Sequence, residues 1–477
     1  MNRKSISIIM GLLSLVSIVV FSAVIMINNL LPNTYKIVLI GILMLIFLLA
    51  VFLCSSKNSK TKLIIGVFIH LVLIISTLAS SYYIVKSIKA LDKISNAGKK
   101  QEIKSDLSLI KLKTKELKTI LENETLAVQT VETEDREKLD SFIDKIEKNL
   151  ESKIKEDQVE SYMTLADNLL EEKTDLIILN EAFRSTINDY ISEFDEKTEV
   201  IESKSFKDFV NQKKEKIGES FNIYISGIDT YGPIQTVSRS DVNLIASVNP
   251  IDRKILLTTI PRDTYIPIYG GGNGQKDKLT HSGIYGIDSS VETIEKFMDL
   301  KIDYYVKVNF NTLIDMVDVL GGIEVENLEA FSNRGYDFPK GKIVLDGKKA
   351  LVFARERYNL KDGDRERGRN QERILKAMIE KMTRPENLLR ADKMLEIIEK
   401  SAVTNMPKDF MIKQINQEII YEGKYQIDMI DVKGTGKMGL SSYAMPGFNL
   451  YMMVPNEDSV NESRMKIQEV LKVSSTN

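Results

Sequence analysis

Three long apolar stretches near the N-terminus set the first limit on how this chain can fold. They span residues 5–27, 35–54 and 63–85, and each is long enough to cross a bilayer core of roughly 30 Å as a helix. The first stretch has a basic start like that of a signal peptide. Its apolar run is too long for one, however, and no small-residue cleavage site follows it. We therefore expect three retained transmembrane helices.

The short loops between these stretches predict the orientation of the chain. Two basic residues precede the first stretch, and three lysines lie between the second and the third, whereas the loop between the first and the second carries only Lys36. The positive-inside rule then places the N-terminus and the second loop in the cytoplasm. After a third crossing, everything beyond residue 86 is expected to lie outside the cell.

This orientation predicts a protease-accessible C-terminal region. Protease added to intact protoplasts should remove residues 86–477, because no bilayer would separate them from the enzyme. Immunoblotting against the C-terminus measures the loss, and a cytoplasmic marker protein serves as the control for intact cells. Full protection of the C-terminus would contradict the orientation.

Composition excludes several classes of site. Cys54, the single cysteine, ends the second apolar stretch, so the outer part can form no disulfide, thiol nucleophile or cysteine zinc site. His281 is the one histidine outside the apolar stretches, and no nucleophile-elbow sequence accompanies it. The net charge of -2 gives no indication of a nucleic-acid partner. Most hydrolase mechanisms built on cysteine or histidine are therefore not expected.

Beyond the apolar stretches, the residue patterns predict two α/β domains, with boundaries at 1–88 for the membrane domain, 89–217 for an accessory domain and 218–477 for a C-terminal domain. The accessory region has no focus of charge, so we interpret it as a solvated spacer, with binding of a partner as the alternative. Alternating apolar patterns predict strands at 105–112, 125–131 and 174–180. Helical patterns predict helices at about 135–153, 160–172 and 181–194.

Three strand-like runs open the C-terminal domain and predict a meander. If the turn at 249–253 pairs residue 248 with 254, residue 242 pairs with 260. Asp229 then lies beside Asp241, and Arg239 and Arg262 fall at the same end of the sheet. Two close carboxylates flanked by arginines suit Mg²⁺ bridging phosphate oxygens. A surface salt-bridge cluster accounts for the same four residues equally well.

The segment 354–373 concentrates arginine. It holds six of the chain's 16 arginines, interleaved with acidic residues, and this pattern does not favour a nucleic-acid patch. Alternation over residues 353–357 predicts a strand that presents Arg355 and Arg357 on one face.

A helix is expected at about 365–382, with Asp364 as a plausible N-cap. Arg367 and Gln371 are one turn apart, and their stripe continues into apolar residues. Such a helix fits a pocket with an ionic mouth and an apolar interior. The arginines off the stripe are expected to be solvated or ion-paired, namely Arg365, Arg369 and Arg373.

The glycine-rich segment 270–286 does not fit a phosphate-binding loop, because neither GxxxxGK[ST] nor a strand-GxGxxG-helix context is present. We interpret it as a loop at the rim of the pocket. His281 within it could assist proton transfer, but a structural role is the preferred interpretation.

From about 221 to 382 the chain resembles the LytR–CpsA–Psr family, whose members are extracytoplasmic enzymes that attach glycopolymers to peptidoglycan. Three apolar spans followed by an accessory domain are most similar to the capsule-attachment (CpsA) branch. The matching segments are SRSDVNLIASVNP, TTIPRDTYIPI, DKLTHSGIYG, YYVKVNFNTLIDMVDVLGGIEV and LDGKKALVFARERYNLKDGDRERGRNQERIL.

The resemblance implies a C-terminal α/β domain with a central mixed sheet flanked by helices, and a phosphotransferase of the glycopolymer–peptidoglycan ligase type. It implies undecaprenyl pyrophosphate as the glycan carrier, peptidoglycan as the acceptor, Mg²⁺ or Mn²⁺ as the cofactor, and a multi-pass protein of a Gram-positive-type cell membrane. The capsule branch adds capsule-assembly proteins as partners. A regulatory protein that binds the lipid without chemistry and a lipid pyrophosphate hydrolase are the alternatives.

The resemblance also implies roles for single residues. Asp229 and Asp241 match the metal-binding aspartates of the family. The family's residues that bind the pyrophosphate head group and act in catalysis correspond to Arg239, Arg262, Arg355, Arg357, Asp364, Arg367 and Gln371. The base that takes the acceptor's proton is left open, with Asp263 and Asp364 as candidates by position.

Overall fold

The structure is a computed structural model of the whole chain. It describes residues 3–29, 31–56, 59–99, 102–121, 125–132, 134–209, 220–228, 234, 237–382, 384, 390–420 and 423–472. Its contacts divide the chain into two compact units, and each is described by itself.

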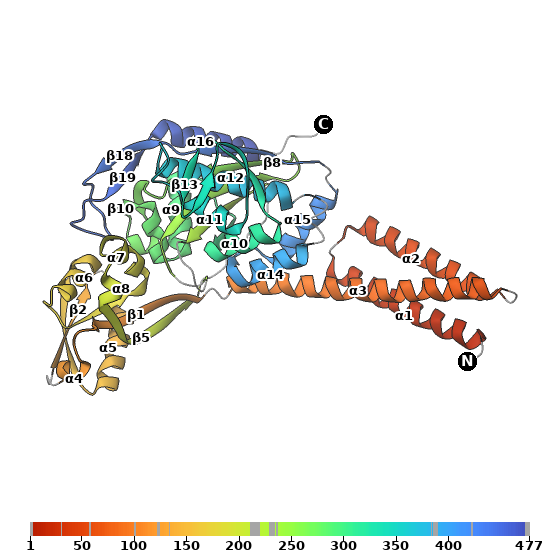
Figure 1. Cartoon of the computed structure of the whole chain (residues 1–477), viewed down its shortest axis with the longest axis horizontal. Helices are drawn as coiled ribbons and strands as arrows, with labels where there is room; N and C mark the ends of the chain where they lie inside the picture. The colour runs from red at the N-terminus through yellow and green to blue at the C-terminus, as the bar shows by residue number, and fades with distance from the viewer. Residues whose placement is uncertain are drawn as a thin grey trace. The chain divides into compact units, whose positions relative to one another are not determined.

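The first unit holds the N-terminal helices and two later segments, Arg384–Lys400 and Met406–Lys424. The three predicted apolar helices are present as α1 (Arg3–Asn28), α2 (Asn33–Cys54) and α3 (Lys60–Lys99) (Figure 1). All three are long and apolar enough to cross a membrane.

The last turns of α3 bind the two later segments of this unit, which form α14 (Ala391–Ser401) and α15 (Lys408–Ile420). Ile88 and Leu91 are buried against Ile412 of α15. Two ion pairs flank this contact, from Lys93 Nζ to Glu399 Oε1 at 2.7 Å and from Lys408 Nζ to Asp92 Oδ1 at 2.7 Å. The end of α3 is therefore part of a packed, charged helix cluster.

The second unit begins with the accessory domain, a five-stranded sheet in the order β3-β2-β4-β1-β5 with helices packed on it. The predicted strands and helices are found there. The elements in chain order are β1 (Glu102–Leu112), α4 (Leu117–Ile120), β2 (Thr125–Val131), α5 (Arg136–Leu150), β3 (Lys153–Val159), α6 (Tyr162–Leu170), β4 (Leu176–Asn180), η1 (Glu181–Phe183), α7 (Arg184–Tyr190), α8 (Phe194–Lys197) and β5 (Thr198–Phe209).

Two strands of this sheet, β3 and β5, are absent from the sequence prediction. Both are edge strands, and both are rich in charged residues. In β3 no residue is fully buried, so its apolar positions are too few to give an alternating pattern. Edge strands commonly carry charge because it discourages pairing with other chains.

The C-terminal domain is built on a six-stranded mixed sheet in the order β16-β11-β6-β7-β8-β17, as the fold prediction expected. Its centre is the predicted meander of β6 (Phe221–Ile228), β7 (Ser240–Asn249) and β8 (Lys254–Thr259). Two strands pair parallel to this meander, β11 (Tyr304–Val308) on β6 and β17 (Gln426–Asp431) on β8. The short edge strand β16 is Ala402–Thr404.

Helices cover both faces of this sheet (Figure 1). One face forms a core with α9 and α16, and the other face packs against Leu375 and Ile379 of α12. The other elements of the domain are β9 (Tyr265–Ile268), η2 (Gly270–Gly272), β10 (Gln275–Lys278), η3 (Leu279–Tyr285), α9 (Ile287–Met298), α10 (Phe310–Val319), β12 (Ile323–Asn327), β13 (Phe331–Asn333), β14 (Tyr336–Phe338), β15 (Gly341–Leu345), α11 (Gly347–Arg355), α12 (Asp364–Met382), β18 (Gly434–Met438), β19 (Tyr451–Pro455) and α16 (Glu457–Leu471).

The register of the meander differs from the prediction by one residue. Val248 pairs with Ile255, and not with residue 254. The turn is one residue shorter than expected, because Asn249 itself pairs with Lys254. The Asn249 side chain accepts from the Asp252 N–H at 3.0 Å inside this turn. Arg253 closes the turn in the left-handed conformation, with φ of 54°.

A second irregularity lies at the other end of β7. Gly227 pairs with Val242, but Ile228 pairs with Ser240, so Asp241 has no residue opposite it on β6. This is a β-bulge, which bends the strand and redirects the side chain of the extra residue. Bulges of this kind are common beside active sites.

The prediction of a strand at residues 353–357 is wrong, because α11 extends to Arg355. Asp346 caps this helix by accepting from the Lys349 N–H at 2.8 Å. Five consecutive residues, 350–354, are buried, so the helix is apolar almost all round and its periodicity is lost. Arg355 and Arg357 therefore do not share a strand face.

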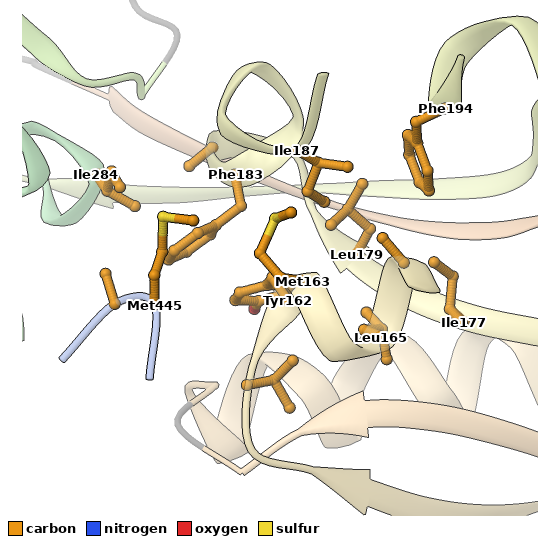
Figure 2. Packing of buried hydrophobic residues seen from close by; sticks show 14 of the residues in the cluster. Tyr162, Met163, Leu165, Ile177, Leu179, Phe183, Ile187, Phe194, Ile284 and Met445 are labelled. Carbon is orange, nitrogen blue, oxygen red and sulfur yellow. The ribbon is translucent and has the colours of Figure 1, made fainter. Parts of the chain in front are cut away.

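The accessory domain shares a hydrophobic core with the C-terminal domain. Phe183 and Ile187 of η1 and α7 pack in one cluster with Ile284 and Met445, which belong to the C-terminal domain (Figure 2). Phe183 also stacks on Tyr162, with the ring centroids 4.1 Å apart. The interpretation of this region as a solvated spacer is therefore wrong for α6 and α7.

The shared core predicts that a destabilising substitution within it will weaken both domains. Phe183 is 7% exposed, and Phe183→Ala should lower the free energy of unfolding by about 3–5 kcal/mol. Amide hydrogen exchange should then become faster in the accessory sheet and also in residues 440–450. Val200→Ala, at a position that is 48% exposed, serves as the control and should change little. Faster exchange confined to the accessory sheet would contradict the shared core.

Candidate functional site

Four of the sequence-predicted site residues line one pocket, namely Asp241, Arg262, Arg367 and Gln371. The pocket lies where β7 begins, where β8 ends and where α12 passes over them. Gly368 permits this close approach, because a Cβ there would lie 3.1 Å from Thr259 Cγ2. The first turns of α12 form one wall, and the positive end of a helix dipole favours anions.

Asp241 is the electrostatic centre of this pocket. Its Oδ2 accepts from Arg262 Nη1 at 2.6 Å, and its Oδ1 accepts from Thr280 Oγ1 at 3.0 Å. Burial alone would raise its pKa, but the charges of Arg262, Arg239 and Arg367 outweigh burial and lower the pKa of Asp241 to about 2. The carboxylate is therefore ionised throughout the physiological range.

Arg239 lies near Asp241 but is held by the accessory domain. It is 3% exposed, and its Nη1 lies 2.7 Å from Asp189 Oδ2 of α7. The next residue, Tyr190, is close enough to Arg239, Asp263 and Arg262 for their charges to affect its pKa, although burial is the larger effect and raises the value. The accessory domain thus contributes side chains to the rim of the site.

Arg355 and Arg357 do not line the pocket. Arg355 ends α11 with its guanidinium 4.4 Å from the ring centroid of Phe310, and Arg357 stacks on Tyr358 at the same distance. Between them, the fully buried Glu356 accepts from the N–H groups of Arg357 and Asn359 at 2.8 and 3.0 Å. Glu356 therefore determines where the chain turns between the two arginines.

Gln371 joins the pocket to α11, because its Nε2 donates to Ala354 O at 3.1 Å.

Arg369 and Arg373, off the stripe, are ion-paired as predicted, both with Glu366, at 3.0 and 2.6 Å. Arg367 N donates to Gly363 O at 3.1 Å, so Gly363 occupies the N-cap position and the prediction of Asp364 there is wrong.

Three residues of the sequence prediction lie wholly or partly outside the described part of the chain. Asp229, proposed as a metal ligand, lies outside the described residues, and so do the side chains of Asp364 and Arg365. The described neighbour of Asp229 is Ile228, which pairs with Ser240 beside the bulge.

The glycine-rich segment forms part of the folded core beside the site. His281 is buried, and its Nδ1 lies 2.8 Å from Asp277 Oδ1, which also accepts from Ser442 Oγ at 2.8 Å. Asp277 Oδ2 accepts from the Ala444 N–H at 2.7 Å. These contacts are structural, in agreement with the preferred interpretation of His281.

Sequence reasoning missed Thr280 and Asp431, which belong to the site. In the sequence Thr280 belongs to no motif that indicates a site. Its hydrogen bond to Asp241 depends on the bulge in β7. Asp431 ends β17 and lines the pocket. Its place at a strand end was a usable signal, but the parallel pairing of β17 with β8 could not be read from sequence.

Two of the described residues that line this pocket, Asp241 and Asp431, carry carboxylates, the kind of ligand that Mg²⁺ takes. The described lining also holds two arginines, so its formal charges cancel. Mg²⁺ is commonly held by one or two carboxylates together with substrate phosphates. Asp241 offers an ionised carboxylate. Among the described residues, however, no group of three acidic, histidine or cysteine side chains surrounds a common point.

The buried Glu372 predicts a pH-dependent stability. Its side chain is 3% exposed, and burial, reinforced by Asp431, raises its pKa to about 7. The folded state then holds a proton that the unfolded chain releases near the ordinary value of 4.5. Stability should therefore fall as the pH rises from 4.5 through 7.

Glu372→Gln should remove this dependence, so that the variant is more stable than the wild type at pH 8 and similar to it at pH 5. Urea unfolding at both pH values measures the difference. The exposed Glu469→Gln is the control and should follow the wild type. Parallel pH curves for the wild type and Glu372→Gln would contradict the proton assigned to Glu372.

Comparisons with known proteins show which family this chain resembles. The LytR_cpsA_psr family model matches residues 182–459, which are 278 of the 477 residues. The polyisoprenyl-teichoic acid–peptidoglycan teichoic acid transferase TagU of Enterococcus faecalis is 34% identical over 242 residues, covering 49% of this chain and 78% of that protein. TagU of Bacillus subtilis is 36% identical over 220 residues, covering 46% and 70%.

Among solved structures, that of Bacillus subtilis TagV aligns with a TM-score of 0.46 and 28% identity, covering 54% of this chain and 98% of that chain. The family match extends from η1 of the accessory domain to the start of α16 and includes every residue of the pocket. The chain therefore belongs to the LytR_cpsA_psr family.

Proposed function

We propose that this protein transfers a glycopolymer from a polyprenyl pyrophosphate carrier to peptidoglycan. The observation that carries the proposal is the pocket in which Asp241, Arg262, Arg367 and Gln371 meet at the first turns of a helix. Guanidinium groups bind phosphate oxygens through paired, charge-assisted hydrogen bonds. The TagU relatives are named for the same type of transfer.

An apolar surface beside the pocket suits the lipid part of such a carrier. On the sheet face that α12 covers, Ile223, Ile225 and Val242 are only partly buried, and so are Leu375 and Ile379 of the helix. A polyprenyl chain lying there would bury apolar area that water otherwise contacts, at roughly 25 cal/mol per Å². Gln371 and Arg367, one and two turns before Leu375 on the same helix, would then meet the head group.

The chemistry divides among the residues of the pocket. An acceptor hydroxyl would attack the phosphorus on the glycan side, a new P–O bond would form, the bridging P–O bond would break, and polyprenyl phosphate would leave. Arg262 and Arg367 would stabilise the charge that develops on the phosphate oxygens. Asp241, with Asp229 as proposed second ligand, would hold Mg²⁺ or Mn²⁺, which when bound supplies further positive charge to these oxygens.

The hydroxyl's proton needs an acceptor. Asp263 is a weak candidate, because Lys278 Nζ lies 2.8 Å from its Oδ1. Burial would raise the pKa of Asp263, but Lys278 and Arg262 outweigh it and lower the value. Asp364 stays a candidate by position.

Several finer points belong to the same proposal. Residues beyond 86 would lie outside the cell membrane, on the same side as the peptidoglycan acceptor. The glycan would be a capsular polysaccharide, a teichoic-acid-like polymer or a related chain on undecaprenyl pyrophosphate, and capsule-assembly proteins would be partners. Arg239, Arg355 and Arg357 would join the phosphate contacts only if their present partners, Asp189, Phe310 and Tyr358, release them.

One experiment separates this function from its alternatives. The detergent-solubilised chain is incubated with a synthetic lipid-pyrophosphoryl glycan and Mg²⁺, with and without peptidoglycan fragments, and lipid phosphate release is measured. We expect release only when the acceptor is present. Release without acceptor would identify a hydrolase, and no release in either case would identify a lipid-binding protein.

Two neighbouring arginines of α12 provide a matched pair for binding. Arg367→Ala should weaken affinity for the lipid pyrophosphate by about tenfold or more, because a charge-assisted hydrogen bond contributes about 1.5–3 kcal/mol. Arg369→Ala removes an arginine that lies outside the pocket and should change the affinity little. Equal loss in both variants, with unchanged thermal melting, would show that the wrong face of α12 was assigned.

A further inference from the structure

A second pocket adjoins the first. It has a volume of about 500 Å³, and its lining includes Pro261, Asp263, Lys361 and Tyr451. Pro261 lines both pockets, and Arg262 lies between the two lining residues Pro261 and Asp263. A molecule in the second pocket would therefore lie next to the phosphate-binding pocket, yet outside it.

Tyr451 is the aromatic wall of this second pocket. It is 47% exposed, although it belongs to β19, which pairs with β18. One side of its ring lies against Gly436, where a Cβ would come within 2.6 Å of the ring carbon Cε2. Any larger residue at 436 would displace the ring, so this glycine permits the ring to lie against the strand.

The same wall is joined firmly to the segment that carries Arg262. The Met453 N–H donates to Asp263 O at 2.7 Å, and Met453 also forms a parallel bridge with Thr264. Tyr451 is therefore held at a constant place relative to Asp263. Binding sites on paired strands of this kind are more rigid than sites on loops.

The polar lining of the second pocket differs from that of the first. Among the described residues it holds two carboxylates, Asp263 and Asp362, and each is ion-paired, with Lys278 at 2.8 Å and with Arg369 at 3.0 Å. Carboxylate oxygens accept hydrogen bonds from sugar hydroxyl and amide groups. An exposed aromatic ring offers a flat apolar surface that suits the C–H face of a pyranose ring.

We propose that this second pocket binds the acceptor saccharide, an uncharged N-acetylated amino-sugar chain, with Tyr451 as its stacking platform and Asp263 and Asp362 as its hydrogen-bond acceptors. The inference rests on the proposed function, because it identifies the peptidoglycan side of that reaction. The acceptor hydroxyl would reach the phosphorus from the pocket that adjoins the first at Pro261, a residue of both linings.

The chain contains no tryptophan, which permits a direct binding test. Tyr451→Trp introduces a single fluorophore into the full-length protein, which is titrated with a tetramer of N-acetylglucosamine. Tyr358→Trp, at a position that is 82% exposed and outside the pocket lining, is the matched control. We expect a saturable change in emission for Tyr451→Trp, none for Tyr358→Trp, and none with poly(glycerol phosphate). No change at Tyr451→Trp, or an equal change in the control, would overturn the proposal.

Kinetics separate this inference from the proposed function. In the transfer assay, Tyr451→Ala should raise the KM for peptidoglycan fragments by about fivefold or more and leave the KM for the lipid donor unchanged, while Tyr451→Phe should stay close to the wild type. Transfer with an unaltered acceptor KM in Tyr451→Ala would reject the subsite and leave the function standing. Saccharide binding without any transfer by the wild type would reject the function and leave the subsite standing.

Discussion

The pocket depends on one half-buried carboxylate. Asp241 is placed without a partner strand residue by the bulge in β7, and it is balanced by Arg262 at 2.6 Å and by the more distant charges of Arg239 and Arg367. The side chains of Arg262 and Asp241 are only 11% and 15% exposed, so loss of either leaves the other without its counter-charge and largely shielded from water. The place of Arg262, and with it one wall of the pocket, therefore follows from Asp241.

Much of the fold was predictable from sequence because its core strands and long helices bury one clear face. The meander was predicted, α12 was predicted at nearly its observed bounds, and Arg367 and Gln371 were placed correctly on the inward stripe of α12. Where the periodic signal disappears, prediction failed. In α11, burial is almost complete, and in β3 it is almost absent, so neither segment shows its secondary structure in its pattern.

The remaining errors concern contacts between segments far apart in the chain. Asp189 and Arg239 are 50 positions apart, and no local pattern links a helix of the accessory domain to the residue that precedes β7 in the C-terminal domain. The one-residue shift at Asn249 arose from a side-chain hydrogen bond inside the turn. Both depend on tertiary geometry, which a single sequence does not encode in any readable spacing.

The two pockets that share Pro261 differ in the side chains that line them. In the first, Arg262 and Arg367 lie beside the start of α12, a combination that favours an anion. In the second, the described lining offers the ring of Tyr451 and two carboxylates, Asp263 and Asp362, each already ion-paired with a cation. A phosphate in the first pocket and a sugar in the second, as proposed, would therefore be bound by different chemistry, charge-assisted hydrogen bonds in one and an aromatic ring in the other.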